Sequence, residues 1–345
     1  MSIISHFLSY KDRLRSYHLH GLKSCGIKKI SNILQTEYSI YKGETILKSK
    51  PYIANIDIGN VCNYKCRFCP TGEGRRGRET IIMSYDRFKD IFFRLHYDYF
   101  LILYLHIWGE PLLNNDLGKI IRLIKEKNVF CGFSTNLSLM TYEKAFEIVE
   151  SGLDFMVLSL DAATEESYRK FRTGTFENVI RGLEYLIKAR GKLKKSKPYL
   201  EWQFILFEHN RSELEMAKRL SVEYGVDNFT VLEPYVEDKT WIPLGKQDKS
   251  VYKHSSLRFC KRPWTHIAIQ SDGGVSPCCW VYYKKDDFGN ILDKDFDGIW
   301  NGGQYISARE ILLNKDGTGI KNVCHLCSKT NVSPFASLRD KDGNA

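Results

Sequence analysis

The sequence lacks any long apolar run. None of its 345 residues belongs to a stretch that approaches the roughly 18 consecutive apolar residues of a membrane-spanning helix. Residues 1–16 also lack the apolar block of a secretory signal peptide, and no low-complexity tract is present. We therefore expect a cytoplasmic protein without a transmembrane segment and without a secreted disulfide framework.

Acidic side chains are in the minority. Asp and Glu number 41 against 51 Lys and Arg, which gives a net charge of +10. A surplus of basic residues can indicate binding to nucleic acid, to an anionic membrane surface or to an acidic substrate. The single basic face or motif of helical nucleic-acid readers is missing, so a nucleic-acid partner is not expected.

Part of the basic surplus lies in residues 1–51, which we predict to be a basic helical N-terminal extension. Its first 50 residues hold nine Lys and Arg against three Asp and Glu. We favour packing of this extension on the rest of the chain, because its apolar stripe is irregular. Peripheral contact with a membrane surface is the alternative. The apolar side chains among its basic residues are Phe7, Leu8, Leu14 and Leu22.

From residue 52 onward, short apolar runs alternate with amphipathic helical patterns. Helix signals include an N-cap at Ser84, a helix from Thr141 that stops at Gly152, and a capping box over residues 212–215. Six strands with helices between them predict an α/β fold, a partial (β/α)6 TIM-like barrel over residues 52–240. The predicted strands cover residues 53–58, 101–107, 130–134, 155–160, 200–207 and 229–232.

The periodicity ends beyond Pro234. Residues 255–345 are turn-rich and cysteine-bearing, with a weak strand signal at residues 265–270. We expect a small C-terminal domain there, held by metal more than by apolar burial.

Cysteine is abundant, with ten residues in a chain that has no export signal. Metal binding is the expected use of such thiols in a reducing compartment. Cys62, Cys66 and Cys69 form a C-x3-C-x2-C pattern after the first predicted strand. Three thiolates can hold three irons of a [4Fe-4S] cluster, whereas a structural zinc site would need a fourth ligand that this loop does not contain. An external ligand on the fourth iron is favoured over an incomplete zinc site.

With the aromatic Phe68 before the third cysteine, this loop resembles the C-x3-C-x-Φ-C signature of the radical SAM superfamily. The resemblance implies that Cys62, Cys66 and Cys69 hold the cluster and that S-adenosyl-L-methionine (SAM) chelates the fourth iron. It also implies a 5′-deoxyadenosyl radical that abstracts hydrogen from a C–H bond. An external electron donor such as flavodoxin or ferredoxin would supply the electron.

Later strands end in residues that match SAM-contacting positions of this superfamily. Gly109-Glu110-Pro111 resembles its Gly-Gly-Glu-Pro element, with Trp108 in place of the first glycine. For Asp161, a helix cap is favoured over a ligand role. The implied cofactor-binding residues are Phe68, Gly109, Glu110, Pro111, Thr135, Asn136, Ser159 and Arg172. Gln203 and Asn210 also match superfamily positions, and for each of them a structural role is favoured.

A second group comprises Cys260, Cys278, Cys324 and Cys327. It resembles the SPASM extension of radical SAM proteins, in the shortened, twitch-like form, because no cysteine follows Cys327. The resemblance implies one auxiliary [4Fe-4S] cluster on these four thiols, and a closed zinc ribbon is the alternative. Cys279 is interpreted as a buried apolar side chain, a substitute ligand or a hydrogen-atom donor.

The two motifs predict an oxidoreductase. We expect a sugar- or cyclitol-like small molecule as substrate, oxidised to a ketone or epimerised. The alternatives are a maturase of a ribosomally made peptide and a two-cluster electron-transfer protein. Glu233 and His106 are candidate bases for a hydroxyl proton, and no catalytic residue is assigned.

Overall fold

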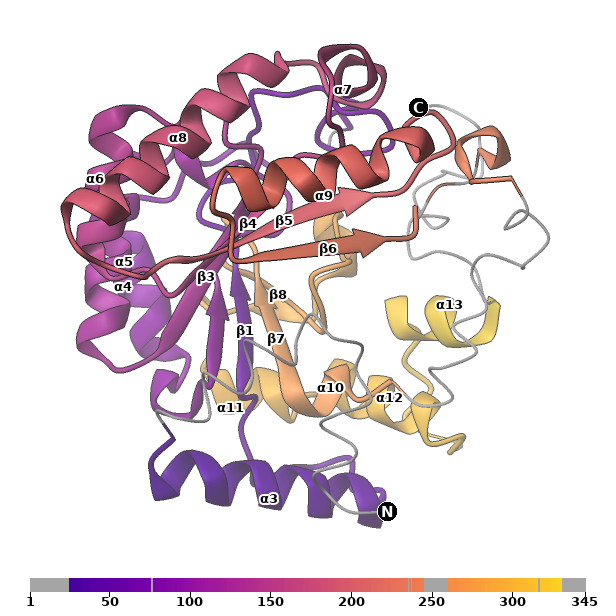
Figure 1. Cartoon of the computed structure of the whole chain (residues 1–345). Helices are drawn as coiled ribbons and strands as arrows, with labels where there is room; N and C mark the ends of the chain where they lie inside the picture. Colours follow the sequence, from indigo (N-terminus) through magenta and orange to yellow (C-terminus); the bar gives the residue numbers. More distant parts are fainter. Residues whose placement is uncertain are drawn as a thin grey trace.

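The computed structural model describes residues 25–75, 77–234, 236, 238–244, 260–315 and 317–330. Its centre is a sheet in which six parallel strands lie side by side in chain order (Figure 1). Among the described residues the first and sixth strands do not pair, so the barrel is open and the predicted partial (β/α)6 TIM-like barrel is confirmed. The strands are β1 (Ile53–Ile56), β2 (Ile102–Tyr104), β3 (Phe130–Thr135), β4 (Phe155–Ser159), β5 (Tyr199–Ile205) and β6 (Asn228–Leu232).

Helices follow the strands, and several begin at the signals in the sequence. The Ser84 side chain accepts a hydrogen bond from the Arg87 amide, and Gly152 ends its helix in the left-handed conformation, with φ of 84°. The short helix α7 (Glu165–Phe171), capped by Thr164, was not predicted. The other helices of the barrel are α4 (Tyr85–Arg94), α5 (Leu117–Glu126), α6 (Tyr142–Ser151), α8 (Phe176–Lys192) and α9 (Leu214–Glu223).

The predicted capping box at residues 212–215 is wrong. A 3-10 turn, η3 (Arg211–Glu213), precedes α9, and no side chain caps the helix. Glu215, the acidic partner of Ser212 in that box, accepts from Lys218 Nζ at 2.7 Å instead. The neighbouring Glu213 carboxylate makes a long-range contact: it accepts hydrogen bonds from the Ala163 amide at 2.8 Å and the Thr164 hydroxyl at 2.5 Å.

The C-terminal segment extends the same sheet. Strand β7 (His266–Ile269) pairs in parallel with β1, and β8 (Gly274–Ser276) and β9 (Gly289–Asn290) follow antiparallel. Trp264, Trp300 and Tyr305 are fully buried and belong to the apolar core that also fills the barrel. This segment therefore buries more apolar surface than its sequence indicated, and the contribution of metal to its stability stays a prediction. Its helices are α10 (Arg262–Thr265), α11 (Phe296–Trp300), α12 (Gly303–Leu312) and α13 (Val323–Thr330).

Helix α3 (Ile27–Lys42) precedes β1 and lies at the end of the sheet where that strand begins (Figure 1). Asn32 fixes it, because its side chain exchanges two 2.8 Å hydrogen bonds with the backbone of Lys50. Phe7, Leu8, Leu14 and Leu22 lie outside the described residues, as do residues 245–259, so the domain boundaries stay predictions. In the part of the chain that the structure describes, no helix is long and apolar enough to cross a membrane.

Candidate active site

Three thiols follow β1 on one loop. Burial raises the pKa of Cys62 to about 12, and the charges of Glu110, Cys66 and Cys69 add to the effect. Burial likewise raises the pKa of Cys66 and of Cys69. Because thiols with raised pKa values are protonated at neutral pH, these side chains need a bound cation before they ionise.

The surroundings of these thiols suit an iron-sulfur cluster. Within the described residues, no three His, Cys, Asp or Glu side chains are arranged to hold a single metal ion. A four-iron cluster takes one thiolate per iron, so its ligands lie further apart than those of one ion. Cys62 Sγ accepts from the Tyr64 amide at 3.4 Å, and Cys66 Sγ accepts from Arg172 at 3.7 Å. Such N–H groups around sulfur tune cluster potentials.

The tripeptide Gly109-Glu110-Pro111 lies directly against the cysteine loop. The Glu110 amide donates to the Val61 carbonyl at 2.8 Å. A Cβ atom on Gly109 would lie 1.6 Å from the carbonyl oxygen of Gly59, so only glycine fits there. Pro111 then opens a 3-10 turn, η2 (Pro111–Leu113).

Glu110 is brought together with Thr135 and Asn136, as the resemblance implied. Its carboxylate accepts from the Thr135 hydroxyl at 2.6 Å, the Asn136 amide at 2.8 Å and the Leu112 amide at 3.1 Å. Burial raises the pKa of Glu110, although these donors oppose the shift. A carboxylate offers about four acceptor sites, so one remains for a ligand donor.

Arg172 and Ser159 lie at the same edge of the sheet. Arg172 Nε donates to Asp161 Oδ2 at 3.0 Å, and the Ser159 hydroxyl lies 2.8 Å from that of Ser134. The other Asp161 oxygen accepts from the Ile205 amide at 2.7 Å, and Thr164 caps the following helix. The interpretation of Asp161 as a helix cap is therefore wrong.

Phe68 and Asn210 have packing or backbone partners. The Phe68 ring meets Trp241 edge to face, with 5.2 Å between centroids. Buried Asn210 uses both ends of its amide on the backbone of Asp161, Ile205 and Phe207, which confirms its structural role. Gln203 is the register partner of Ser159 on the neighbouring strand.

His106 is a poor candidate base. Its Nδ1 accepts a 3.0 Å hydrogen bond from the Ser134 amide. A neutral imidazole that accepts at Nδ1 carries its proton on Nε2, so neither ring nitrogen is ready to take another proton. Glu233, the first residue after β6, is exposed.

The C-terminal thiols are also neighbours. Burial raises the pKa of Cys324, and the charges of Cys278, Cys260 and Cys327 add to it. Burial followed by the charges of Cys278 and Cys260 raises the pKa of Cys327 to about 11. Cys260 and Cys278 interact in the same way, so all four thiols lie within electrostatic reach of one another. Cys279 faces Arg262 instead, 3.9 Å from its guanidinium.

Sequence reasoning missed the buried Asp57, which directly follows β1. Its carboxylate accepts hydrogen bonds from the Ile107 amide at 3.2 Å and the Trp108 amide at 3.3 Å. These bonds fix the loop between β2 and Gly109. Burial raises the pKa of Asp57 to about 7. The only signal in the sequence was an acidic residue that closes an apolar run.

A cavity of about 300 Å³ lies between the cysteine loop and the C-terminal segment. Gln270, fully buried at its wall, donates from Nε2 to the Val281 carbonyl at 3.0 Å, while its Oε1 has no hydrogen-bond partner. We call this space the Gln270 cavity. Its lining residues are Asn60, Val61, Cys62, Thr71, Gly74, Arg75, Arg78, Thr80, Trp108, Gln270 and Tyr282.

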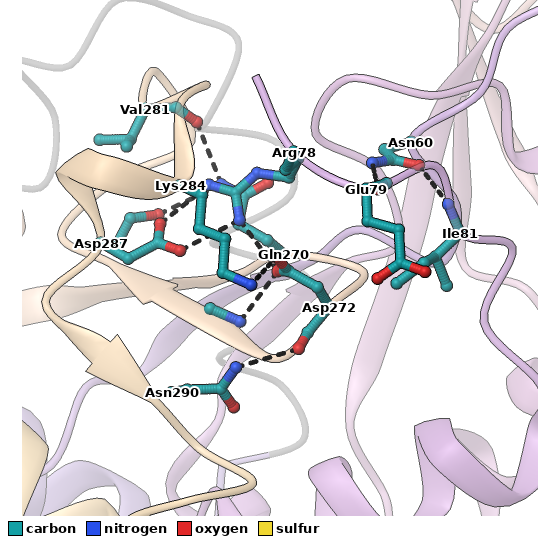
Figure 2. Close-up of polar contacts among 12 residues, drawn as sticks. Asn60, Arg78, Glu79, Ile81, Gln270, Asp272, Val281, Lys284, Asp287 and Asn290 are labelled. Atoms are coloured by element: carbon teal, nitrogen blue, oxygen red, sulfur yellow. Dashed lines mark hydrogen bonds and ion pairs between the residues drawn. The ribbon is translucent and has the colours of Figure 1, made fainter. Parts of the chain in front are cut away.

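An ion-pair network stiffens one wall of the Gln270 cavity. Figure 2 shows Arg78 between Asp272 and Asp287, each 2.9 Å from its guanidinium. Arg78 is only 3% exposed and comes from the segment after the cysteine loop, whereas both carboxylates come from the C-terminal segment. The network therefore ties the two parts of the chain together beside the cavity.

Two family models match the chain. The model of the radical SAM superfamily matches residues 56–196, and the chain belongs to that superfamily. The model of the SPASM iron-sulfur cluster-binding domain matches residues 260–328. The protein is thus a SAM-dependent iron-sulfur enzyme with a SPASM domain, a membership that implies [4Fe-4S] clusters and SAM as cofactors.

Curated relatives are distant. The tungsten-containing aldehyde ferredoxin oxidoreductase cofactor-modifying protein of Pyrococcus furiosus is 23% identical over 333 residues, which cover 83% of this chain and 90% of that protein. A probable GTP 3′,8-cyclase of Saccharolobus islandicus is 27% identical over 217 residues, 62% of this chain and 65% of the cyclase.

Solved structures share the fold. Streptococcus suis SuiB bound to S-adenosylmethionine has a TM-score of 0.62 and 18% identity, over 79% of this chain and 70% of SuiB. BtrN in complex with AdoMet and 2-DOIA has a TM-score of 0.51 and 17% identity, over 77% of this chain and 88% of BtrN. Identities this low show a common fold alone.

Proposed function

We propose that this enzyme abstracts hydrogen from a sugar- or cyclitol-like small molecule held in the Gln270 cavity, leading to dehydrogenation or epimerisation. The observation that carries the proposal is the unpartnered Gln270 Oε1, fully buried in the wall of a cavity that Cys62 also lines. A buried acceptor without a partner is costly, and a substrate hydroxyl would satisfy it.

The size of the cavity favours a small molecule. About 300 Å³ lies at the lower end of the range of about 300–1,000 Å³ for small-molecule sites. The rings of Trp108 and Tyr282, 5.3 Å apart between centroids, offer apolar faces for the C–H face of a sugar-like ring.

The residues at the strand ends would hold the cofactor. Cys62, Cys66 and Cys69 would bind a [4Fe-4S] cluster with SAM on the remaining iron, which when bound supplies the 5′-deoxyadenosyl radical. The free acceptor site of Glu110 suits the SAM amine, with Thr135 and Asn136 fixing the carboxylate. Gly109 and Pro111 would shape the backbone approach. The remaining SAM contacts would come from Phe68, Ser159 and Arg172. The Arg172 guanidinium suits a carboxylate such as that of SAM.

Cys260, Cys278, Cys324 and Cys327 would hold one auxiliary [4Fe-4S] cluster, a one-electron acceptor within the same molecule. Iron and sulfide analysis of the reconstituted protein tests this assignment. About eight irons per chain support it, and about four irons with one zinc ion reject it.

Deuterium transfer tests the substrate class. The reconstituted enzyme is incubated anaerobically with dithionite, SAM and deuterated aminocyclitols, sugars or, in a separate arm, peptides, and deuterium in 5′-deoxyadenosine is measured. Transfer that falls at least about tenfold in Gln270→Leu supports the proposal, since the lost hydrogen bond is worth about 1.4 kcal/mol or more. Transfer from peptides alone would favour the maturase alternative; SuiB, which shares the fold, was solved with its precursor peptide SuiA.

A further inference from the structure

A second cavity, of about 350 Å³, opens beside Cys66 and shares no lining residue with the Gln270 cavity. Five of its ten lining residues are basic, and only one is acidic. We call it the Cys66 groove. Its lining residues are Lys65, Cys66, Arg67, Gly72, Glu73, Arg169, Lys170, Phe171, Arg172 and Thr173.

The two walls of the Cys66 groove are fixed to each other. The Lys65 amide donates to the Thr173 hydroxyl at 2.8 Å, and the Arg67 amide donates to the Phe171 carbonyl at 3.3 Å. These bonds join the cysteine loop to the end of α7. The basic side chains therefore stand on a preformed surface.

Of the five basic side chains at the Cys66 groove, only Arg172 has a buried ion-pair partner. The one acid of the groove, Glu73, pairs with Arg75 outside the groove at 2.6 Å. Arg169 and Lys170 pair with Glu165 and Glu166 across exposed turns of α7, contacts of little energy. Arg172 pairs with the buried Asp161. Lys65 and Arg67 are exposed and form no ion pair with any described residue. The groove therefore presents positive charge to solvent.

We infer that the Cys66 groove is the docking surface for an acidic one-electron carrier protein of the flavodoxin or ferredoxin class. The inference rests on the proposed function, because the cluster assigned to Cys62, Cys66 and Cys69 needs one external electron for each SAM cleaved. The carrier loses one electron and the cluster gains it. Docking here brings the carrier to Cys66 while the Gln270 cavity stays open to substrate.

Charge complementarity favours such a partner. Positive surfaces attract acidic proteins over distances near the Debye length, about 10 Å at 0.1 M salt, and raise their association rates. A carrier must bind briefly and release, which suits a small polar contact better than a large apolar one.

The test uses the reconstituted enzyme and a purified flavodoxin. Flavodoxin affinity is measured by titration at low and at about 0.3 M salt, and cluster reduction by flavodoxin hydroquinone and by dithionite is followed in stopped flow. The groove variant is Lys65→Glu/Lys170→Glu. Its control, the α8 variant, is Lys188→Glu/Lys192→Glu, which makes the same change of charge on α8, where that helix approaches the opposite end of the sheet. Lys65→Gln is a milder second variant.

We expect the groove variant to bind flavodoxin at least about tenfold more weakly at low salt, and Lys65→Gln to show a smaller loss. Dithionite should reduce the cluster of the groove variant as fast as that of the unmodified enzyme, because a small reductant needs no docking surface. Equal flavodoxin affinity in the groove and α8 variants would overturn the inference. The inference would also be overturned if millimolar pyrophosphate lowered the affinity for flavodoxin while the groove substitutions left that affinity unchanged. A cluster that dithionite cannot reduce in the unmodified enzyme would instead count against the proposed function.

Discussion

The indole N–H of Trp108 donates a 2.9 Å hydrogen bond to the carbonyl oxygen of Val281. This bond joins the loop after β2, just before Gly109, to the C-terminal segment. Gln270 donates to the same carbonyl, and the Trp108 ring meets Tyr282 edge to face. The residue that replaces a glycine of the superfamily element therefore connects the proposed SAM loop to the wall of the Gln270 cavity.

We predict that Trp108→Phe lowers the free energy of unfolding by about 1 kcal/mol, because the ring contact with Tyr282 is kept and one hydrogen bond is lost. Urea denaturation followed by circular dichroism measures the change. Trp108→Gly, which restores the superfamily residue, should cost more, since it also removes the ring. Equal stability of Trp108→Phe and the unmodified protein would show that the bond to Val281 contributes nothing.

Gly109→Ala should be strongly destabilising. The added methyl group would meet the Gly59 carbonyl at 1.6 Å, and because both partners are backbone the clash should cost about 3 kcal/mol or more. The matched control is Gly191→Ala in α8, where a Cβ meets nothing within 4 Å. That control should gain up to about 1 kcal/mol from helix propensity. Chemical denaturation of both variants checks the pair, and similar small effects would contradict the close approach.

Arg78→Met should cost about 3–5 kcal/mol, because it leaves the buried Asp287 without its cation and Asp272 with only Lys284, 3.7 Å away. The control Arg94→Met breaks an exposed pair with Asp90 and should cost less than about 1 kcal/mol. The double variant Arg78→Met/Asp287→Leu should recover part of the loss. If Arg78→Met behaved like Arg94→Met in urea denaturation, the network would not hold the two segments together.

Asp57 should make stability depend on pH. Burial raises its pKa to about 7, so the folded protein keeps a proton between about pH 4 and 7 that the unfolded chain has lost. The free energy of unfolding therefore falls as pH rises through this window, by up to about 1.4 kcal/mol per pH unit. The variant Asp57→Asn should lack this pH dependence. It also loses one of the two oxygens that accept backbone hydrogen bonds, so at pH 5 it should be less stable than the unmodified protein.

Urea denaturation at both pH values checks the Asp57 prediction. The gap between the unmodified protein and Asp57→Asn should narrow by about 2–3 kcal/mol from pH 5 to pH 7. Burial also raises the pKa of Asp287, to about 6, but both proteins contain this residue, so its contribution cancels. Parallel pH profiles would show that Asp57 is ionised throughout.

Local patterns predicted the barrel because its strands and helices carry their own signals. Short apolar runs located β1 to β6, and Ser84 and Gly152 act on their own helices. The failures were long-range. The pairing of β7 with β1 joins residues more than 200 positions apart, and Glu213 accepts a hydrogen bond from Ala163, 50 positions earlier in the chain.

The same division holds for the site. Chemistry encoded by spacing, such as the loop of Cys62, Cys66 and Cys69, could be predicted from the sequence alone. Arg78 and Gln270 could not, since single polar residues at scattered positions carry no spacing signal until the fold places them around one cavity.

The central claim is that Cys62, Cys66 and Cys69 hold a cluster on which SAM is cleaved. Anaerobic incubation of the reconstituted protein with dithionite and SAM, followed by quantification of 5′-deoxyadenosine, tests it most directly. We predict 5′-deoxyadenosine from the unmodified protein and from Cys279→Ala, and none from Cys62→Ala/Cys66→Ala/Cys69→Ala. Product from the triple variant, or none from the unmodified protein with its clusters intact, would contradict the account.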